Sequence, residues 1–136
     1  MSYSEDRRKH LEMIQAVITR MAGNSFLIRG WTVTLVAALF ALAADKANRS
    51  FVVVAYFPSI AFWCLDAYYL AQERRFRALY DAAAEDPEAS TVTLYSMNTK
   101  LAGSQTGFGS AFWSVTVITF HLSIVVVISI VMWLLP

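Results

Sequence analysis

The chain has 136 residues, of which 57% are hydrophobic and only 15% are charged. Because a soluble domain carries roughly 25% charged residues, this composition favours a lipid bilayer as the solvent for much of the chain. The net charge of +1 gives no reason to expect a nucleic acid partner. Three apolar segments take up about half of the residues, which leaves room for one small helical bundle and no second domain.

Residues 1–25 are predicted to form an amphipathic N-terminal helix that is cytoplasmic or interfacial. Over residues 4–22, apolar side chains recur every three or four positions, as one face of a helix requires. Gly23 predicts the end of this helix, because glycine accepts the left-handed backbone found at helix C-termini. We expect the helix either to lie on the membrane surface or to pack against copies of itself. The apolar stripe expected to support self-association consists of Leu11, Ile14, Ile18 and Met21.

Residues 26–71 are predicted to form a transmembrane hairpin with spans at 26–44 and 51–71. At about 1.5 Å per residue, each span is long enough to approach or reach the roughly 30 Å of a hydrocarbon core. The polar turn at 45–50 is short, so the two spans should run antiparallel. Pro58 lies inside the second span and predicts a kink, because proline removes one backbone hydrogen bond.

The helical pattern continues beyond the second span, so residues 72–108 are predicted to be a cytoplasmic helix extension followed by a loop. The extension should end near Glu85, since the residue before Pro87 avoids helical backbone angles. Residues 91–97 alternate well enough for a short strand, and an extended loop fits them equally. The extension also carries a cytoplasmic basic cluster of Arg74, Arg75 and Arg77.

Residues 109–136 are predicted to be the third transmembrane helix. This segment is the most apolar of the three, and Trp113 and Trp133 lie near its ends, where an aromatic belt would place them. The expected fold is therefore an all-α membrane protein. It has three transmembrane helices, an N-terminal amphipathic helix and a cytoplasmic extension of the second span.

The distribution of basic residues predicts the orientation of the chain. Eight lysines and arginines precede the first span or follow the second, whereas the turn between these spans holds only Lys46 and Arg49. Cytoplasmic loops are enriched in lysine and arginine. We therefore expect a multi-pass protein of the bacterial inner membrane with a cytoplasmic N-terminus and a periplasmic or outside C-terminus, Pro136.

Arg29 and Asp66 are candidate polar residues within the membrane. A carboxylate in the middle of a transmembrane helix costs about 2.5–3.5 kcal/mol on insertion scales, so it usually faces a partner or a cavity. Arg29 enters the first span at a depth similar to that of Asp66. A structural clasp between the two helices is one interpretation. The others are a polar cavity or pore between protomers, and snorkelling of each charge to the membrane surface.

His121 lies near the middle of the third span and is the other intramembrane candidate. A histidine there could relay protons or bind a metal, but no second ligand has a fitting spacing. We expect it to be hydrogen-bonded between helices. Cys64 is the only cysteine, so it cannot form an internal disulfide, and a buried, inert thiol is expected.

The sequence shows no catalytic set, so we expect a protein that is not an enzyme and that uses no cofactor and no metal. No second histidine lies near a serine or cysteine to act as a general base. No glycine-rich turn follows a strand to hold a phosphate.

Several segments of the chain resemble those of a known group of proteins. They are Lys9–Gln15 with Arg20–Phe26, Leu65–Leu70 with Gln72–Arg74, and Tyr95–Thr99. With these motifs the chain resembles, over nearly its whole length, a family of small bacterial three-span membrane proteins, some of which occur beside anti-phage defence genes. The resemblance implies a membrane-resident effector or partner of a multi-component system, and it supplies no catalytic residues.

Three functions are compatible with these features. The first is a homo-oligomeric membrane effector or pore-forming component, for which the family resemblance suggests a role in anti-phage defence. The second is an accessory or adaptor subunit that docks a cytoplasmic protein partner through 4–22 and 72–105. A transporter of a small solute ranks below both, because it would normally need more spans or internal repeats.

Overall fold

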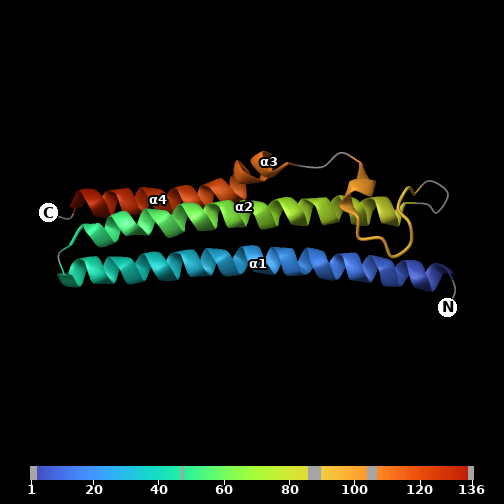
Figure 1. The fold of residues 1–136 in the computed structure, drawn as a ribbon, viewed down its shortest axis with the longest axis horizontal. Coiled ribbons are helices and arrows are strands. Elements are labelled where there is room, and N and C mark those ends of the chain that lie inside the picture. Colours follow the sequence, from blue (N-terminus) through green and yellow to red (C-terminus); the bar gives the residue numbers. More distant parts are fainter. Residues whose placement is uncertain (1–2, 47, 86–89, 104–106, 135–136) are drawn as a thin grey trace.

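The computed structural model describes residues 3–46, 48–85, 90–103 and 107–134, and over these residues the chain is helical with no strand (Figure 1). Three of its helices are long and apolar enough to cross a membrane. The elements are α1 (Tyr3–Lys46), α2 (Ser50–Ala84), the 3-10 helix η1 (Thr99–Ala102), α3 (Phe108–Phe112) and α4 (Val115–Leu134).

Helix α1 runs without a break from Tyr3 to Lys46, so the predicted stop at Gly23 and the separate N-terminal helix are wrong. A glycine inside a helix costs about 1 kcal/mol relative to alanine, which is too little to end a helix that neighbouring residues favour. A Cβ added at Gly23 would meet no atom within 4 Å, so close packing does not require glycine there. The N-terminal segment therefore continues the axis of the first span.

Helix α2 lies between α1 and α4 and runs antiparallel to both (Figure 1). It continues through Pro58 and ends at Ala84, close to the predicted end at Glu85. Helix α4 covers only the first part of α2, so the far parts of α1 and α2 project beyond it. The predicted break at Asp86-Pro87 and the C-terminal Pro136 lie outside the described residues.

Two apolar cores hold the helices together. One lies among the three long helices and is built around Val36, Val52 and Ile128. The other lies where α1 and α2 project beyond α4, and the residues 90–102 pack over it. We call this projecting part the stem, defined as residues 3–22 of α1, 72–84 of α2 and 90–102.

The stem core corrects the predicted self-association stripe on α1. Ile14 and Ile18 are buried against Leu79 and Ala83 of α2, and Leu11 is partly buried beside them. An apolar stripe on a polar helix is covered by the nearest apolar face, and α2 of the same chain supplies that face. This stripe is therefore used within one protomer, and Met21 is left half-buried at its end.

Residues 90–102 form a strap across α1 and α2, and they contain no strand. The buried His10 contacts the backbone carbonyl oxygen of Ser96 through Nε2 at 2.8 Å. The hydroxyl of Ser90 donates to the carbonyl oxygen of Ala82 at 2.8 Å. Tyr95, with a φ of 63°, turns the strap. A side chain of α1 thus satisfies a backbone carbonyl of the strap, and a side chain of the strap satisfies a backbone carbonyl near the end of α2.

Tyr95 provides a test of how the strap is held, because its hydroxyl donates a hydrogen bond to Asp6 at 2.8 Å. This hydrogen bond to the carboxylate raises the pKa of Tyr95. Since the folded pKa lies above the unfolded one, the contact stabilises the strap at pH values below about 10 and is lost as the pH rises through the folded pKa. We expect phenolate absorbance to show Tyr95 ionising at lower pH in Asp6→Asn, with Tyr95→Phe identifying its signal. An unchanged titration would show that Asp6 does not hold this hydroxyl.

The third span begins later than the sequence predicted. Residues 109–112 belong to the short helix α3, and Trp113 and Ser114 separate it from α4, which begins at Val115. The carbonyl oxygen of Ser114 accepts the first hydrogen bond of α4, from the backbone N–H of Ile118 at 2.8 Å. The prediction of one helix over 109–136 is therefore wrong at its start. As a consequence, His121 lies within the first two turns of α4.

Candidate functional site

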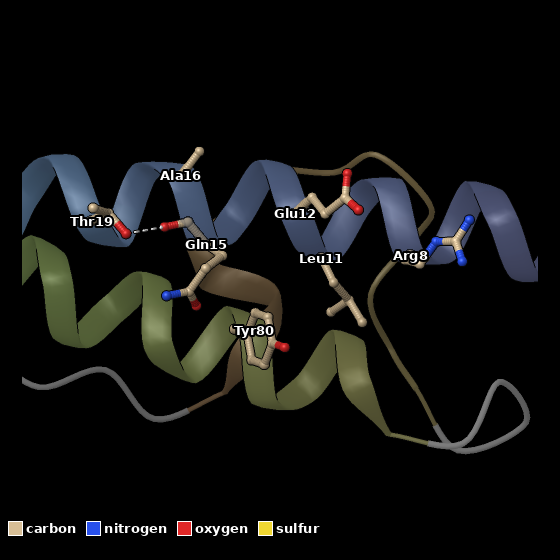
Figure 2. Close-up of a pocket in the computed structure, with 7 residues that line it drawn as sticks. All are labelled: Arg8, Leu11, Glu12, Gln15, Ala16, Thr19 and Tyr80. Carbon is tan, nitrogen blue, oxygen red and sulfur yellow. Dashed lines mark hydrogen bonds between the residues drawn. The ribbon is translucent and has the colours of Figure 1, made fainter.

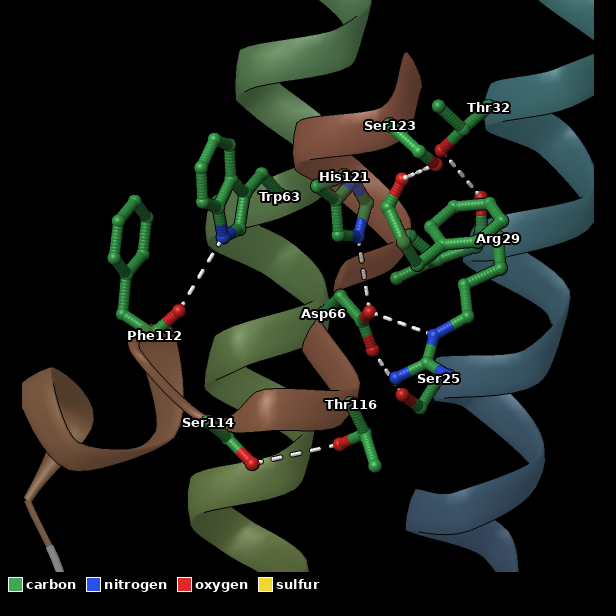
Figure 3. Close-up of polar contacts among 12 residues, drawn as sticks. Ser25, Arg29, Thr32, Trp63, Asp66, Phe112, Ser114, Thr116, His121 and Ser123 are labelled. Carbon is green, nitrogen blue, oxygen red and sulfur yellow. Dashed lines mark hydrogen bonds and ion pairs between the residues drawn. The ribbon is translucent and has the colours of Figure 1, made fainter. Parts of the chain in front are cut away.

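A carboxylate that is entirely buried, Asp66 of α2, is the point where the three long helices are joined (Figure 3). Arg29 of α1 donates from Nε to Asp66 Oδ2 at 2.8 Å, and His121 of α4 lies with Nε2 at 2.9 Å from the same oxygen. Ser25 of α1 donates its hydroxyl to Asp66 Oδ1. We call Ser25, Arg29, Asp66 and His121 the Asp66 cluster.

Helical spacing explains how α1 supplies two of these donors. Ser25 and Arg29 are four residues apart, so they lie on the same face of α1 and reach both oxygens of one carboxylate. The next turn presents Thr32, whose hydroxyl donates to its own helix at Ile28 at 2.8 Å. Arg29 remains 30% exposed, whereas His121 is 1% exposed. The Arg29 side chain is therefore more exposed than the carboxylate and the imidazole that it joins.

Aromatic rings enclose the histidine. Trp63 stacks on the His121 ring with 5.9 Å between centroids, and Phe120 meets that ring edge to face at 4.9 Å. Phe112 of α3 stacks on the other side of Trp63 at 4.8 Å. The Arg29 guanidinium lies 5.6 Å from the centroid of Phe120. These rings exclude solvent, which strengthens the charged hydrogen bonds and raises the cost of any group left unpaired.

One buried nitrogen of the Asp66 cluster, His121 Nδ1, has no hydrogen-bond partner among the described residues. Because Asp66 is a carboxylate and can only accept, Nε2 must carry the proton that is donated to it. In a neutral imidazole, Nδ1 is then an acceptor with a free lone pair.

The Asp66 cluster lies within the layer that a bilayer would occupy. Arg49 donates to the carbonyl oxygen of Met132 at 2.7 Å, at one end of α4. At the other end, Arg74 donates to the hydroxyl of Ser114 at 3.0 Å. These two arginines are about 37 Å apart along α2 at about 1.5 Å per residue, close to the thickness of a bilayer with its interfaces. Asp66 lies about 12 Å from the Arg74 end on the same scale.

The predicted basic cluster is divided among different contacts. Arg74 also donates to Ser110 at 3.3 Å and so ties α2 to α3 and to the start of α4. Arg77 pairs with Glu73 on its own helix at 2.7 Å. Arg75 Nε is buried and has no hydrogen-bond partner in the described part of the chain. The three arginines therefore do not form a common site.

The structure brings together all three intramembrane candidates of the sequence analysis, Arg29, Asp66 and His121. The Arg29–Asp66 contact is the clasp that the sequence suggested. The contact of His121 with Asp66 was not predicted from the sequence, because the predicted start of the third span is too early and places His121 too deep. Ser25 was not predicted either, although its four-residue spacing to Arg29 was an available signal. Cys64 is exposed on α2, contrary to the expectation of a buried thiol.

A groove on the stem is the second candidate site (Figure 2). Leu11, Ala16 and the Tyr80 ring provide its apolar lining, and side chains of both charges stand at its edges. Its volume is about 590 Å³. A smaller groove beside it shares Gln15 and Tyr80. The full lining of the larger groove is Arg8, Leu11, Glu12, Gln15, Ala16, Thr19 and Tyr80.

No group of three or more histidine, cysteine or acidic side chains that could hold a metal ion occurs within the described ranges. In comparisons with known proteins, no family model, curated protein or solved structure matches this chain.

Proposed function

We propose that this chain is a small protein of the bacterial inner membrane that self-associates through its stem and acts as a membrane effector, as a component of a pore. Its N-terminus and stem are cytoplasmic, because eight of the ten lysines and arginines outside the spans lie on that side. The family resemblance supports an effector within a multi-component system, with anti-phage defence as the proposed setting.

The stem groove is the observation that carries self-association. It lies outside the apolar parts of the helices, so lipid does not cover it, and Leu11, Ala16 and Tyr80 line it with apolar surface. Copies of one membrane protein share the same orientation and are confined to two dimensions. Two stems that meet therefore lie parallel, and two helical hairpins pairing in this way form a four-helix bundle.

Charges around the groove suit a second copy. Arg8 and Glu12 lie one turn apart on α1, and Arg77 and Asp81 lie one turn apart on α2 along the same length of stem. A twofold axis along the membrane normal would set α1 of one copy against α2 of the other. The paired stems would then bring together side chains of both signs and not of one sign alone, which avoids the cost of like charges meeting.

Assembly of the stems would bring the apolar parts of several copies side by side. Large apolar side chains cover the outer surfaces of all three long helices, including Phe26, Phe57 and Trp133. Only 17–28% of the most apolar stretch of each helix is buried within the chain. A pore would form between protomers, because within one chain Asp66 and its donors are closed against each other.

Cysteine crosslinking tests the proposed interface. In a Cys64→Ser background, we expect Ala16→Cys in the groove to form disulfide-linked dimers rapidly in native membranes. Met13→Cys is the matched control, since Met13 is on the same helix and 39% exposed but does not line the groove. Equal crosslinking of both variants, or a monomer in nanodiscs at all concentrations, would contradict self-association through the stem groove.

The effector role has its own test. Overproduction of the wild-type chain should reduce the membrane potential, measured with a potential-sensitive dye, and Glu12→Arg should weaken this effect by blocking assembly. A second substitution, Arg8→Glu with Glu12→Arg, should restore part of it. If the wild-type chain forms dimers and the membrane potential does not change, the effector role is contradicted, whereas self-association is not.

An adaptor role is the second candidate function, and the exposed surface of the strap is the observation that supports it. Leu94 and Tyr95 expose apolar surface at the strap, on the stem and away from the groove. Apolar side chains exposed to water at such a position suit contact with a protein partner. A chain that stays monomeric and leaves the potential unchanged would favour this role over the effector.

A further inference from the structure

We propose that His121 is a proton-binding site within the membrane, and that a proton on His121 replaces Arg29 as the counter-charge of Asp66. This inference rests on the Asp66 cluster alone and does not depend on self-association.

The shared oxygen is the first observation. Arg29 Nε and His121 Nε2 lie 2.8 Å and 2.9 Å from the same atom, Asp66 Oδ2. Both donors therefore act on one oxygen, and a positive charge on either of them changes the charge balance of the same carboxylate. A buried carboxylate needs one positive partner, and two fixed positive charges beside it would leave an uncompensated charge in a medium of low polarity.

The free nitrogen is the second observation. His121 Nδ1 is buried, and no described residue offers it a hydrogen bond. An incoming proton would bind to the lone pair of Nδ1, while the N–H at Nε2 would stay on Asp66. No covalent bond to carbon changes and no electron is transferred. Water supplies the proton and receives it back.

The position of Arg29 is the third observation. Its side chain is 30% exposed, whereas Asp66 and His121 are 0% and 1% exposed. A long arginine side chain can extend from its helix to the membrane surface. Arg29 is therefore the cation of the cluster whose side chain can move away from Asp66 toward the membrane surface. Its guanidinium would then lose its contact with the Phe120 ring.

The surroundings of His121 contain few other charges. Among the described residues, the charged group in contact with it is Asp66, and Arg29 follows through that carboxylate. The rings of Trp63 and Phe120 also lie against it. When His121 is neutral, Arg29 balances Asp66, and when His121 is protonated, Arg29 is in excess. Proton binding would thus release the charged contact of α1 with α2 and α4.

Nitrogen-15 NMR of histidine-labelled protein in nanodiscs tests the exchange. At pH 7.5 we expect His121 in the wild-type chain to show an unprotonated Nδ1, and we expect that resonance to be lost in Arg29→Gln, where His121 must supply the positive charge. In Arg29→Gln with Asp66→Asn the unprotonated resonance should return, because no carboxylate remains to be balanced. His10, outside the cluster, serves as the unchanged internal reference.

A neutral His121 in Arg29→Gln would overturn the proposal, since it would mean that Asp66 takes the proton itself. If Arg29→Gln does not fold, acidification of the wild-type chain decides the question. The Nε resonance of Arg29 should then move over the same pH range in which His121 takes its proton. An Arg29 signal that stays unchanged while His121 is protonated would equally overturn it.

Discussion

Replacing Asp66 with asparagine should destabilise the protein by about 3 kcal/mol, the lower end of the cost of breaking a buried ion pair. The substitution removes the charge that holds Arg29 of α1 and His121 of α4 on α2. Arg29 is partly exposed, so part of its charge can be hydrated at the surface, which limits the loss. Unfolding in mixed detergent micelles, followed by tryptophan fluorescence, measures the change because Trp63 stacks on His121.

Asp81→Asn provides the matched control, since Asp81 is an exposed acid on the same helix. This variant should unfold within about 0.5 kcal/mol of the wild-type chain. Exchanging the two charges, in Arg29→Asp with Asp66→Arg, should recover part of the stability that either single change removes. Equal stability of Asp66→Asn and Asp81→Asn would show that the Asp66 cluster contributes nothing to holding the helices together.

Shortening a buried side chain in the core of the stem should also destabilise the protein strongly. Ile14 is 0% exposed and packs in one cluster with Leu79, so Ile14→Ala should cost about 2–5 kcal/mol through lost contacts and a residual cavity. The loss should be confined to the stem, which we expect to become sensitive to limited proteolysis and to exchange its amide hydrogens faster. The apolar parts of the three long helices should keep their protection.

Met13→Ala is the control for this change, because Met13 is its neighbour on α1 and 39% exposed. It should alter stem protection by no more than about 0.5 kcal/mol. If Ile14 instead formed an interface between copies, Ile14→Ala would reduce oligomer size and leave the stem of the monomer protected. That result would contradict the packing of Ile14 against α2.

The Asp66 cluster shows how far the sequence alone could reach. The cost of a carboxylate in an apolar helix was enough to single out Asp66 and to suggest Arg29 as its partner. The third residue, His121, could be placed beside Asp66 only once the start of α4 was known. A shift of several residues at a helix start changes the depth of every residue in that helix by about 1.5 Å per position. With α4 beginning at Val115, His121 meets Asp66.

The stem shows a different limit. An apolar stripe indicates that one face of a helix is covered, and it does not say by what. Ile14 and Ile18 are covered by the same chain, through α2 and the strap. The fold decides this because the turn between α1 and α2 is short and holds their projecting ends side by side, at a far higher effective concentration than a second copy would have.

The sequence by itself determined the presence of three helices long and apolar enough to cross a membrane, because length and composition set these properties residue by residue. It also singled out the charged side chains within them. Only the tertiary structure decided that α1 continues through Gly23, that the apolar stripe faces α2, and that Ser25, Arg29 and His121 share one carboxylate. Each of these depends on a neighbouring helix, whose register and starting point are properties of the packed chain and not of any local segment.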